Sequence, residues 1–242
     1  MKQKIAYLTI DDGPTEDMKE KIDFLDSKEI KAIWFCQGDK LEKFSKQATY
    51  AIKKGHIIGS HAYNHPYFSE ISITEAKEQI RKTDKIIDSI YESSGTKRPI
   101  KVFRFPFLDN GDNNYGNCDW NNEHVKQIQQ FLKELGYIHP KFKDINYDWY
   151  KKAGFTKCIN VDCSYDTYDW CLEEGVEEHG YKDLPTILSR IDEDTPERGR
   201  GLNFSDSNDV IMMHVWIPLE SFKAIINRLL EKKINFELPK WN

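Results

Sequence analysis

Apolar residues along this chain occur in two patterns that alternate from its first segments to its last. Short continuous runs at 5–10, 32–35 and 210–214 predict buried strands. Between such runs the apolar side chains recur every three or four residues, as in 16–27 and 219–232, which predicts helices with one buried face. Strands that alternate with helices favour an α/β fold with a parallel sheet, either open or closed into a barrel.

The same patterns place the remaining elements. We expect further strands at 56–60, 102–107, 158–163 and 234–238, and further helices at 41–52, 123–135 and 182–191. Thr74 is the expected N-cap of one more helix, a long one that reaches at least Ile90. A polar loop and an aromatic-rich stretch interrupt this plan. We therefore expect residues 1–242 to form a single domain with a loop-rich insertion around 108–157.

Two adjacent carboxylates, Asp11 and Asp12, follow the first apolar run, and Gly13-Pro14 then turns the chain away. Neighbouring residues of a regular strand point to opposite sides, so a regular strand would bury one of these carboxylates. A bend in the strand or a bound cation would bring both into one cleft. A plain Asp-Gly turn explains this segment equally well when it is taken alone.

Two histidines, His61 and His65, follow another strand-like run. A spacing of four residues predicts that both imidazoles lie on one face of a helical turn, where they could bind one ion. Two solvent-exposed histidines are the alternative interpretation. One aspartate and two histidines would form a metal site that leaves positions open for water and substrate.

Three further segments carry candidate chemistry. Arg104 lies within an apolar run, and a buried guanidinium requires a carboxylate partner. Asp166 and Asp169 lie beside Trp170, and His214 ends the apolar run at 210–214. Arg104 and His214 could each be structural residues when taken singly. As an ordered set at the ends of predicted strands, these residues indicate an active site.

In this order the segments resemble the motifs of the polysaccharide deacetylase, or NodB-homology, family of carbohydrate esterases. The family's T-F-D-D-G-P, H-S/T-x-x-H, R-x-P-Y/F, D-x-x-D-W-like and L-x-H motifs correspond here to 9–14, 61–65, 104–107, 166–170 and 212–214. Ile10 and Met212 replace the usual Phe and Leu, and Ala62 replaces the hydroxyl residue that usually follows the first histidine. The resemblance implies a distorted (β/α) barrel with seven rather than eight units.

The resemblance also implies roles for individual residues. Asp12, His61 and His65 would be the ligands of one divalent metal ion. Asp11 would be the general base, and Arg104 would hold it in place. His214 would be the general acid, oriented by Asp169 or by Asp166, between which the sequence does not decide. The expected contacts with substrate are the backbone near Phe107 and an apolar wall of Trp170 and Met212.

The function implied is hydrolysis of an acetyl group, N-linked or O-linked, on a carbohydrate such as a GlcNAc-containing oligo- or polysaccharide. Zn²⁺ is the expected cofactor, and Co²⁺, Ni²⁺ or Fe²⁺ would also suit a His₂Asp site. Two alternatives remain open. One is a related barrel amidohydrolase that acts on a small non-sugar amide, and the other is a non-catalytic carbohydrate-binding relative.

Charge, hydropathy and cysteine content indicate which partners and which cell compartment to expect. Lys and Arg total 35 against 40 Asp and Glu, without a long basic block, so nucleic acid is not an expected partner. No apolar stretch is long enough to span a membrane. Without a signal peptide the chain as given is expected in the cytoplasm, whereas a trimmed exported protein would belong to the envelope or the exterior. Five cysteines form no C-x-x-C pair, and we expect Cys158 and Cys163 to be buried free thiols of a reducing compartment, with disulfides as the alternative.

Overall fold

A parallel sheet with the strand order β3-β2-β1-β5-β4 forms the centre of the computed structural model, which describes residues 4–114, 117–194, 201–204 and 206–241. The short strand β6 pairs separately with the start of β1. The strands are β1 (Ile5–Gly13), β2 (Ala32–Cys36), β3 (Ile57–Ser60), β4 (Tyr165–Asp166), β5 (Asp209–His214) and β6 (Asn235–Phe236). The predicted strands at the start of the chain and at 210–214 are confirmed.

Strand β1 is buried on both faces, as is usual for a central parallel strand. Its residues Ala6, Leu8 and Ile10 belong to the apolar cluster that the outer helices cover. Tyr7 points to the other face and belongs to a separate cluster that includes Phe35. The period of two along β1 therefore separates the layer beneath the helices from the interior of the barrel.

Backbone hydrogen bonds continue the sheet from β3 back to β5. Ser60 donates to the carbonyl of Val102 at 2.9 Å, and Val161 donates to the carbonyl of Phe103 at 2.8 Å. Ser164, directly before β4, then donates to Val210 at 2.9 Å. These bonds close a distorted α/β barrel, which confirms the expected fold. The strands expected at 102–107 and 158–163 are wrong as regular elements, because each contributes only isolated bonds to the ring.

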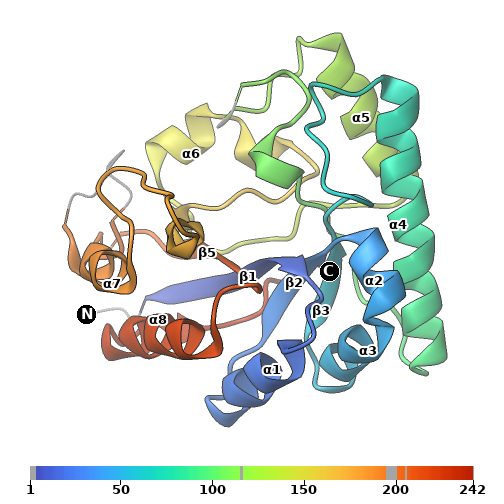
Figure 1. The fold of residues 1–242 in the computed structure, drawn as a ribbon. Coiled ribbons are helices and arrows are strands. Elements are labelled where there is room, and N and C mark those ends of the chain that lie inside the picture. The colour runs from blue at the N-terminus through green and yellow to red at the C-terminus, as the bar shows by residue number, and fades with distance from the viewer. Residues whose placement is uncertain (1–3, 115–116, 195–200, 205, 242) are drawn as a thin grey trace.

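Helices surround the sheet (Figure 1). Successive contacts join α7 to α8, α8 to α1, α1 to α3, α3 to α4 and α4 to α5, so these helices follow one another around the barrel. The helices are α1 (Met18–Ser27), α2 (Gly38–Lys43), α3 (Ser45–Lys53), α4 (Ile73–Ser93), α5 (Glu123–Glu134), α6 (Asp148–Lys152), α7 (Leu184–Asp192) and α8 (Leu219–Glu231). Among the described residues, short 3₁₀ turns occur at Pro106–Leu108, Phe155–Lys157 and Asp169–Leu172.

Two helix predictions need correction. Ser72, not Thr74, caps α4, because its hydroxyl accepts a hydrogen bond from the backbone N–H of Glu75. The single helix expected at 41–52 is two helices, α2 and α3, which meet at Phe44 with a non-helical ψ of 38°. Among the described residues, no helix is both long and apolar enough to cross a bilayer.

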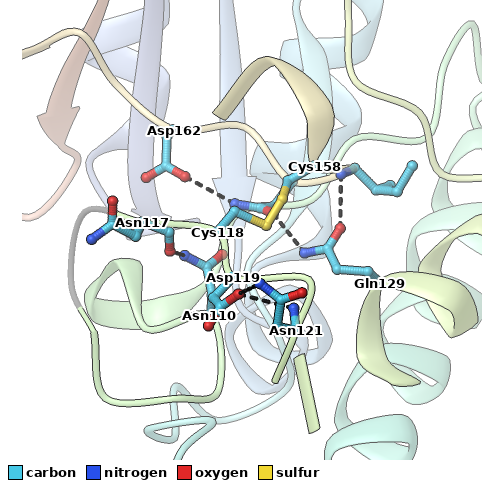
Figure 2. Close-up of a disulfide and its surroundings, with 10 residues drawn as sticks. Asn110, Asn117, Cys118, Asp119, Asn121, Gln129, Cys158 and Asp162 are labelled. Atoms are coloured by element: carbon cyan, nitrogen blue, oxygen red, sulfur yellow. Dashed lines mark hydrogen bonds between the residues drawn. A yellow bond between two sulfur atoms is a disulfide. The ribbon is translucent and has the colours of Figure 1, made fainter. Parts of the chain in front are cut away.

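A disulfide joins Cys118 to Cys158, with a Cα–Cα distance of 6.4 Å (Figure 2). Cys158 is therefore not a free thiol, and the sequence prediction was wrong for this residue, whereas Cys163 is buried and forms no disulfide, as expected. The backbone N–H of Cys118 also donates to the carbonyl of Ala153 at 2.9 Å. The disulfide thus ties the polar loop of the insertion to the segment that follows α6.

Candidate active site

The end of β1 brings Asp11 and Asp12 into the same cavity. The register between β1 and β2 shifts between Ile10 and Gly13, and Asp12 has a left-handed φ of 66°. This bend removes the strict alternation of a strand, so both carboxylates line one cavity of about 480 Å³. Of the possibilities left open by the sequence, the structure has the bend in the strand.

His61 and His65 reach the same cavity from the loop after β3. Their Nε2 atoms lie 3.6 Å and 3.1 Å from Asp12 Oδ1. The prediction of a helical turn from their spacing is wrong. The segment between β3 and α4 contains no helix or strand, and Ala62 and His65 have left-handed φ angles of 61°. The left-handed backbone at these two residues, and not the pitch of a helix, brings the imidazoles together.

Asp12, His61 and His65 can hold a metal ion. One ligand atom from each residue lies within 4.8 Å of the others. Burial lowers the pKa of His61 to about 4, so its imidazole is neutral at neutral pH. Its Nδ1 lies 2.8 Å from the carbonyl oxygen of Arg104, which assigns the proton to Nδ1 and leaves the Nε2 lone pair facing Asp12. The donors and their protonation states fit a divalent cation.

The Asp12 carboxylate is ionised and oriented by its neighbours. Burial alone would raise the pKa of Asp12, but the hydrogen bond with His65 and the nearby histidine charges hold it well below its usual value. Gln37 Nε2 donates to Oδ1 at 2.7 Å, and Trp216 Nε1 donates to Oδ2 at 3.1 Å. The sequence analysis missed Gln37 and Trp216. Gln37 directly follows β2 and Trp216 lies two residues beyond β5, so their positions at strand ends were the available signal.

Arg104 is fully buried and contacts Asp11, as its isolation in an apolar run predicted. Its Nη1 donates to Asp11 Oδ1 and to Thr9 Oγ1, both at 2.8 Å, and its Nε donates to the carbonyl of Val161 at 2.9 Å. Burial of the guanidinium lowers its pKa, but the attraction of Asp11 outweighs this and the pKa is raised. Arg104 therefore remains charged and fixes one oxygen of Asp11.

Asp169, not Asp166, contacts His214. Asp169 Oδ1 lies 2.8 Å from His214 Nδ1, and Oδ2 accepts a hydrogen bond from the His214 backbone at 2.7 Å. Burial lowers the pKa of His214, but the charge of Asp169 and its hydrogen bond outweigh this effect and raise the pKa to about 10. Asp166 instead lines the cavity, where it accepts hydrogen bonds from the Tyr168 backbone and from Trp170 Nε1 at 2.8 Å and 3.3 Å.

The remaining predicted residues, Phe107, Trp170 and Met212, also line this cavity. Met212 and His214 come from β5, which pairs in register with β1 so that Asp11 lies opposite His214. All eleven residues singled out in the sequence are thus brought together at one end of the barrel. The wall also contains Leu108 and Glu173, for which the sequence offered no signal.

Comparison with known proteins agrees with this arrangement. The family model described as polysaccharide deacetylase matches residues 1–136, more than half of the chain. The chain belongs to the polysaccharide deacetylase family. A peptidoglycan-N-acetylglucosamine deacetylase of Bacillus cereus is 37% identical over 84 residues, which are 34% of this chain and 30% of that protein. The chain therefore matches less than a third of the length of this relative.

Two solved structures of polysaccharide deacetylase relatives share the fold. A family 4 carbohydrate esterase from Streptomyces lividans, in complex with acetate, has a TM-score of 0.63 and 17% identity over 97% of this chain and 92% of its own. A CE4 family pseudoenzyme from Bacillus anthracis has a TM-score of 0.61 and 16% identity over 97% of this chain and 63% of its own. An esterase and a pseudoenzyme have this architecture in common, so an argument about activity must rest on the residues of the site.

Proposed function

We propose that this chain is a metal-dependent deacetylase that removes N-acetyl groups from a GlcNAc-containing glycan. The observation that carries the proposal is the grouping of Asp12, His61 and His65 in a cavity that also contains Asp11 and His214. A protein that only binds carbohydrate needs neither a buried general base nor a charged histidine beside it. The deacetylase named among the relatives acts on N-acetylglucosamine in peptidoglycan, which supports this class of substrate.

Asp12, His61 and His65 would hold the cation, for which Zn²⁺ is our proposal. When bound, a divalent cation polarises the acetyl carbonyl and lowers the pKa of a neighbouring water molecule. Neutral His61 and ionised Asp12 are already in the protonation states that metal ligation requires. Gln37 and Trp216 would keep the Asp12 carboxylate in position, as outer hydrogen bonds do in other metal sites.

The chain's own residues would move the protons. Asp11 accepts a proton from the attacking water through Oδ2, because Arg104 occupies Oδ1. His214, charged and held at Nδ1 by Asp169, donates its Nε2 proton to the departing sugar nitrogen. Water and the N-acetyl group thus become acetate and a free amine. The backbone N–H of Phe107, at the cavity wall, is our candidate to stabilise the developing oxyanion.

Release of acetate tests this proposal. The purified chain, supplied with Zn²⁺, is incubated with N-acetylated chitooligosaccharides and with peptidoglycan fragments, and acetate and free amine are quantified. We expect equal amounts of both products, and no turnover by the Asp11→Asn variant, which keeps the size of the side chain but cannot accept the proton.

An Asp166→Asn variant is the matched control, because it makes the same change in the same cavity at a residue that does not contact Arg104 or His214. We expect this variant to retain acetate release. Turnover by Asp11→Asn at the wild-type rate would remove Asp11 as the base. Sugar binding without release of acetate would show that the chain is a carbohydrate-binding protein and not a deacetylase.

A further inference from the structure

The two histidines of the candidate metal centre are held in different ways. The His61 side chain is 3% exposed, and the Arg104 carbonyl fixes its Nδ1 at 2.8 Å. The His65 side chain is 21% exposed and lies in a loop with a left-handed backbone. Among the described residues, the polar partner of the His65 ring is Asp12, and none hydrogen-bonds its other nitrogen. The hydrogen bond that usually orients a ligating histidine is thus present for His61 and missing for His65.

Aromatic rings contact His65 instead. The centroid of the Phe107 ring lies 4.4 Å from that of His65, with an angle of 68° between the planes. On Phe107 lies the ring of Tyr67, parallel to within 5° at a centroid distance of 3.8 Å. We call Tyr67 and Phe107 the ring pair. The perpendicular contact between Phe107 and His65 is a favoured arrangement of aromatic rings, and Tyr67 in turn packs on Phe107, so the ring pair restricts how the His65 imidazole can turn.

A buried carboxylate fixes the two segments that carry the ring pair. Asp109, which is fully buried, accepts hydrogen bonds from the backbone N–H and the hydroxyl of Ser69, both at 2.8 Å, and from Gly111 N at 2.9 Å. Ser69 lies two residues after Tyr67, and Asp109 two residues after Phe107. Phe107 has a left-handed φ of 55°, which a non-glycine residue keeps only where its surroundings hold it. The backbone N–H of Asp109 donates to the carbonyl of Pro106 at 3.0 Å, so this hydrogen bond spans Phe107 and contributes to that restraint.

We propose that Tyr67 and Phe107 are positioning residues for His65, and that the ring pair restricts the orientation of this imidazole, as the Arg104 carbonyl restricts that of His61. The inference rests on the proposed function, because it assumes that His65 is a metal ligand. It assigns a role in the site to Tyr67, which belongs to none of the sequence motifs and does not line the cavity. The consequence is specific: the affinity for metal depends on two aromatic side chains that do not touch the metal.

Isothermal titration of the metal-free protein with Zn²⁺ tests the inference without any use of activity. Tyr67→Leu and Phe107→Leu remove one ring each, and we expect each to weaken the affinity for Zn²⁺ roughly tenfold, as the loss of an outer partner of a ligand does. Tyr67→Phe and Phe107→Tyr keep the rings and should bind as the wild type does. Trp170→Leu removes a cavity aromatic whose ring contacts Tyr168 and not His65, and it should leave the affinity unchanged.

Thermal unfolding of each metal-free variant shows whether the fold is intact. Tyr67 is half-buried and Phe107 is 44% exposed, so neither substitution opens the core, and either variant alone can decide the question. Wild-type affinity in a folded Leu variant would overturn the inference and leave the proposed function standing. Failure of the wild type itself to bind Zn²⁺ would overturn the proposed function, and the inference with it.

Discussion

Replacing Asp169 with asparagine should lower the pKa of His214. In the wild type this pKa is raised to about 10, and the charge of Asp169 and its 2.8 Å hydrogen bond are the main causes that raise it. An asparagine would use its oxygen to accept from the His214 backbone and would turn its NH₂ group toward Nδ1, which disfavours a proton there. The loss of a charge in direct contact shifts a pKa by roughly one to three pH units. A shift of two pH units corresponds to about 2.7 kcal/mol of lost preference for the charged imidazole.

NMR titration of the histidine ring in metal-free protein measures this pKa directly. We expect a midpoint near 10 in the wild type and a midpoint lower by roughly one to three pH units in Asp169→Asn. With the proposed substrate, the alkaline limb of the kcat profile should move in the same direction, because His214, the proposed general acid, loses its proton at a lower pH. Asp166→Asn removes the same charge without breaking a bond to His214, so its effect should be smaller. Equal midpoints in the wild type and Asp169→Asn would refute the assignment of Asp169 as the partner that charges His214.

Three further predictions concern stability. Arg104→Leu leaves Asp11 buried without its partner and should lower the free energy of unfolding by about 3–5 kcal/mol in urea titrations, so a loss below about 1 kcal/mol would count against the pair. Replacing both Cys118 and Cys158 with serine opens a loop of 40 residues and should lower the free energy of unfolding by about 4 kcal/mol. A wild-type protein whose free energy of unfolding is the same with and without a reductant would contradict this prediction. Burial lowers the pKa of His56 to about 4, below that of the unfolded chain, so its contribution to stability is lost as the pH falls from about 6.5 to about 4. His56→Gln should make the unfolding free energy less sensitive to pH in that window, and an unaltered dependence would exclude His56 as its source.

The barrel could be predicted because its main strands are continuous apolar runs bounded by turns. The run at 5–10 has no alternation of polar residues, and β1 is accordingly buried on both faces. The run at 102–107 looked the same, yet the Arg104 carbonyl accepts a hydrogen bond from the His61 side chain instead of from a neighbouring strand, and Phe107 turns into a left-handed conformation. An apolar run shows that a segment is buried, but not that its backbone is regular.

The site could be predicted as a set of residues but not as a geometry. A spacing of four residues suggested a helical turn for His61 and His65, whereas two left-handed residues in a loop produce the convergence. The residue types at these two positions, alanine and histidine, do not indicate a left-handed backbone. Asp166 and Asp169 were indistinguishable in sequence, because only the 3₁₀ turn at Asp169–Leu172 decides which carboxylate faces His214.

The disulfide was missed for a related reason. Cys118 lies in a polar loop and Cys158 in an apolar run 40 residues later, and no local pattern links the two. Their proximity depends on how the insertion packs, including the bond from Cys118 to Ala153. Contacts that depend on the path of a long loop are set by tertiary packing, which a single sequence does not reveal.

Quantification of bound metal tests the central claim most directly. After stripping with a chelator and reloading with Zn²⁺, elemental analysis should find one ion per chain in the wild type and in Asp11→Asn, which keeps the three proposed ligands. Asp12→Ala and His61→Ala should each lose that ion while remaining folded. A wild-type chain without stoichiometric metal, or an Asp12→Ala variant that still binds one ion, would contradict the account.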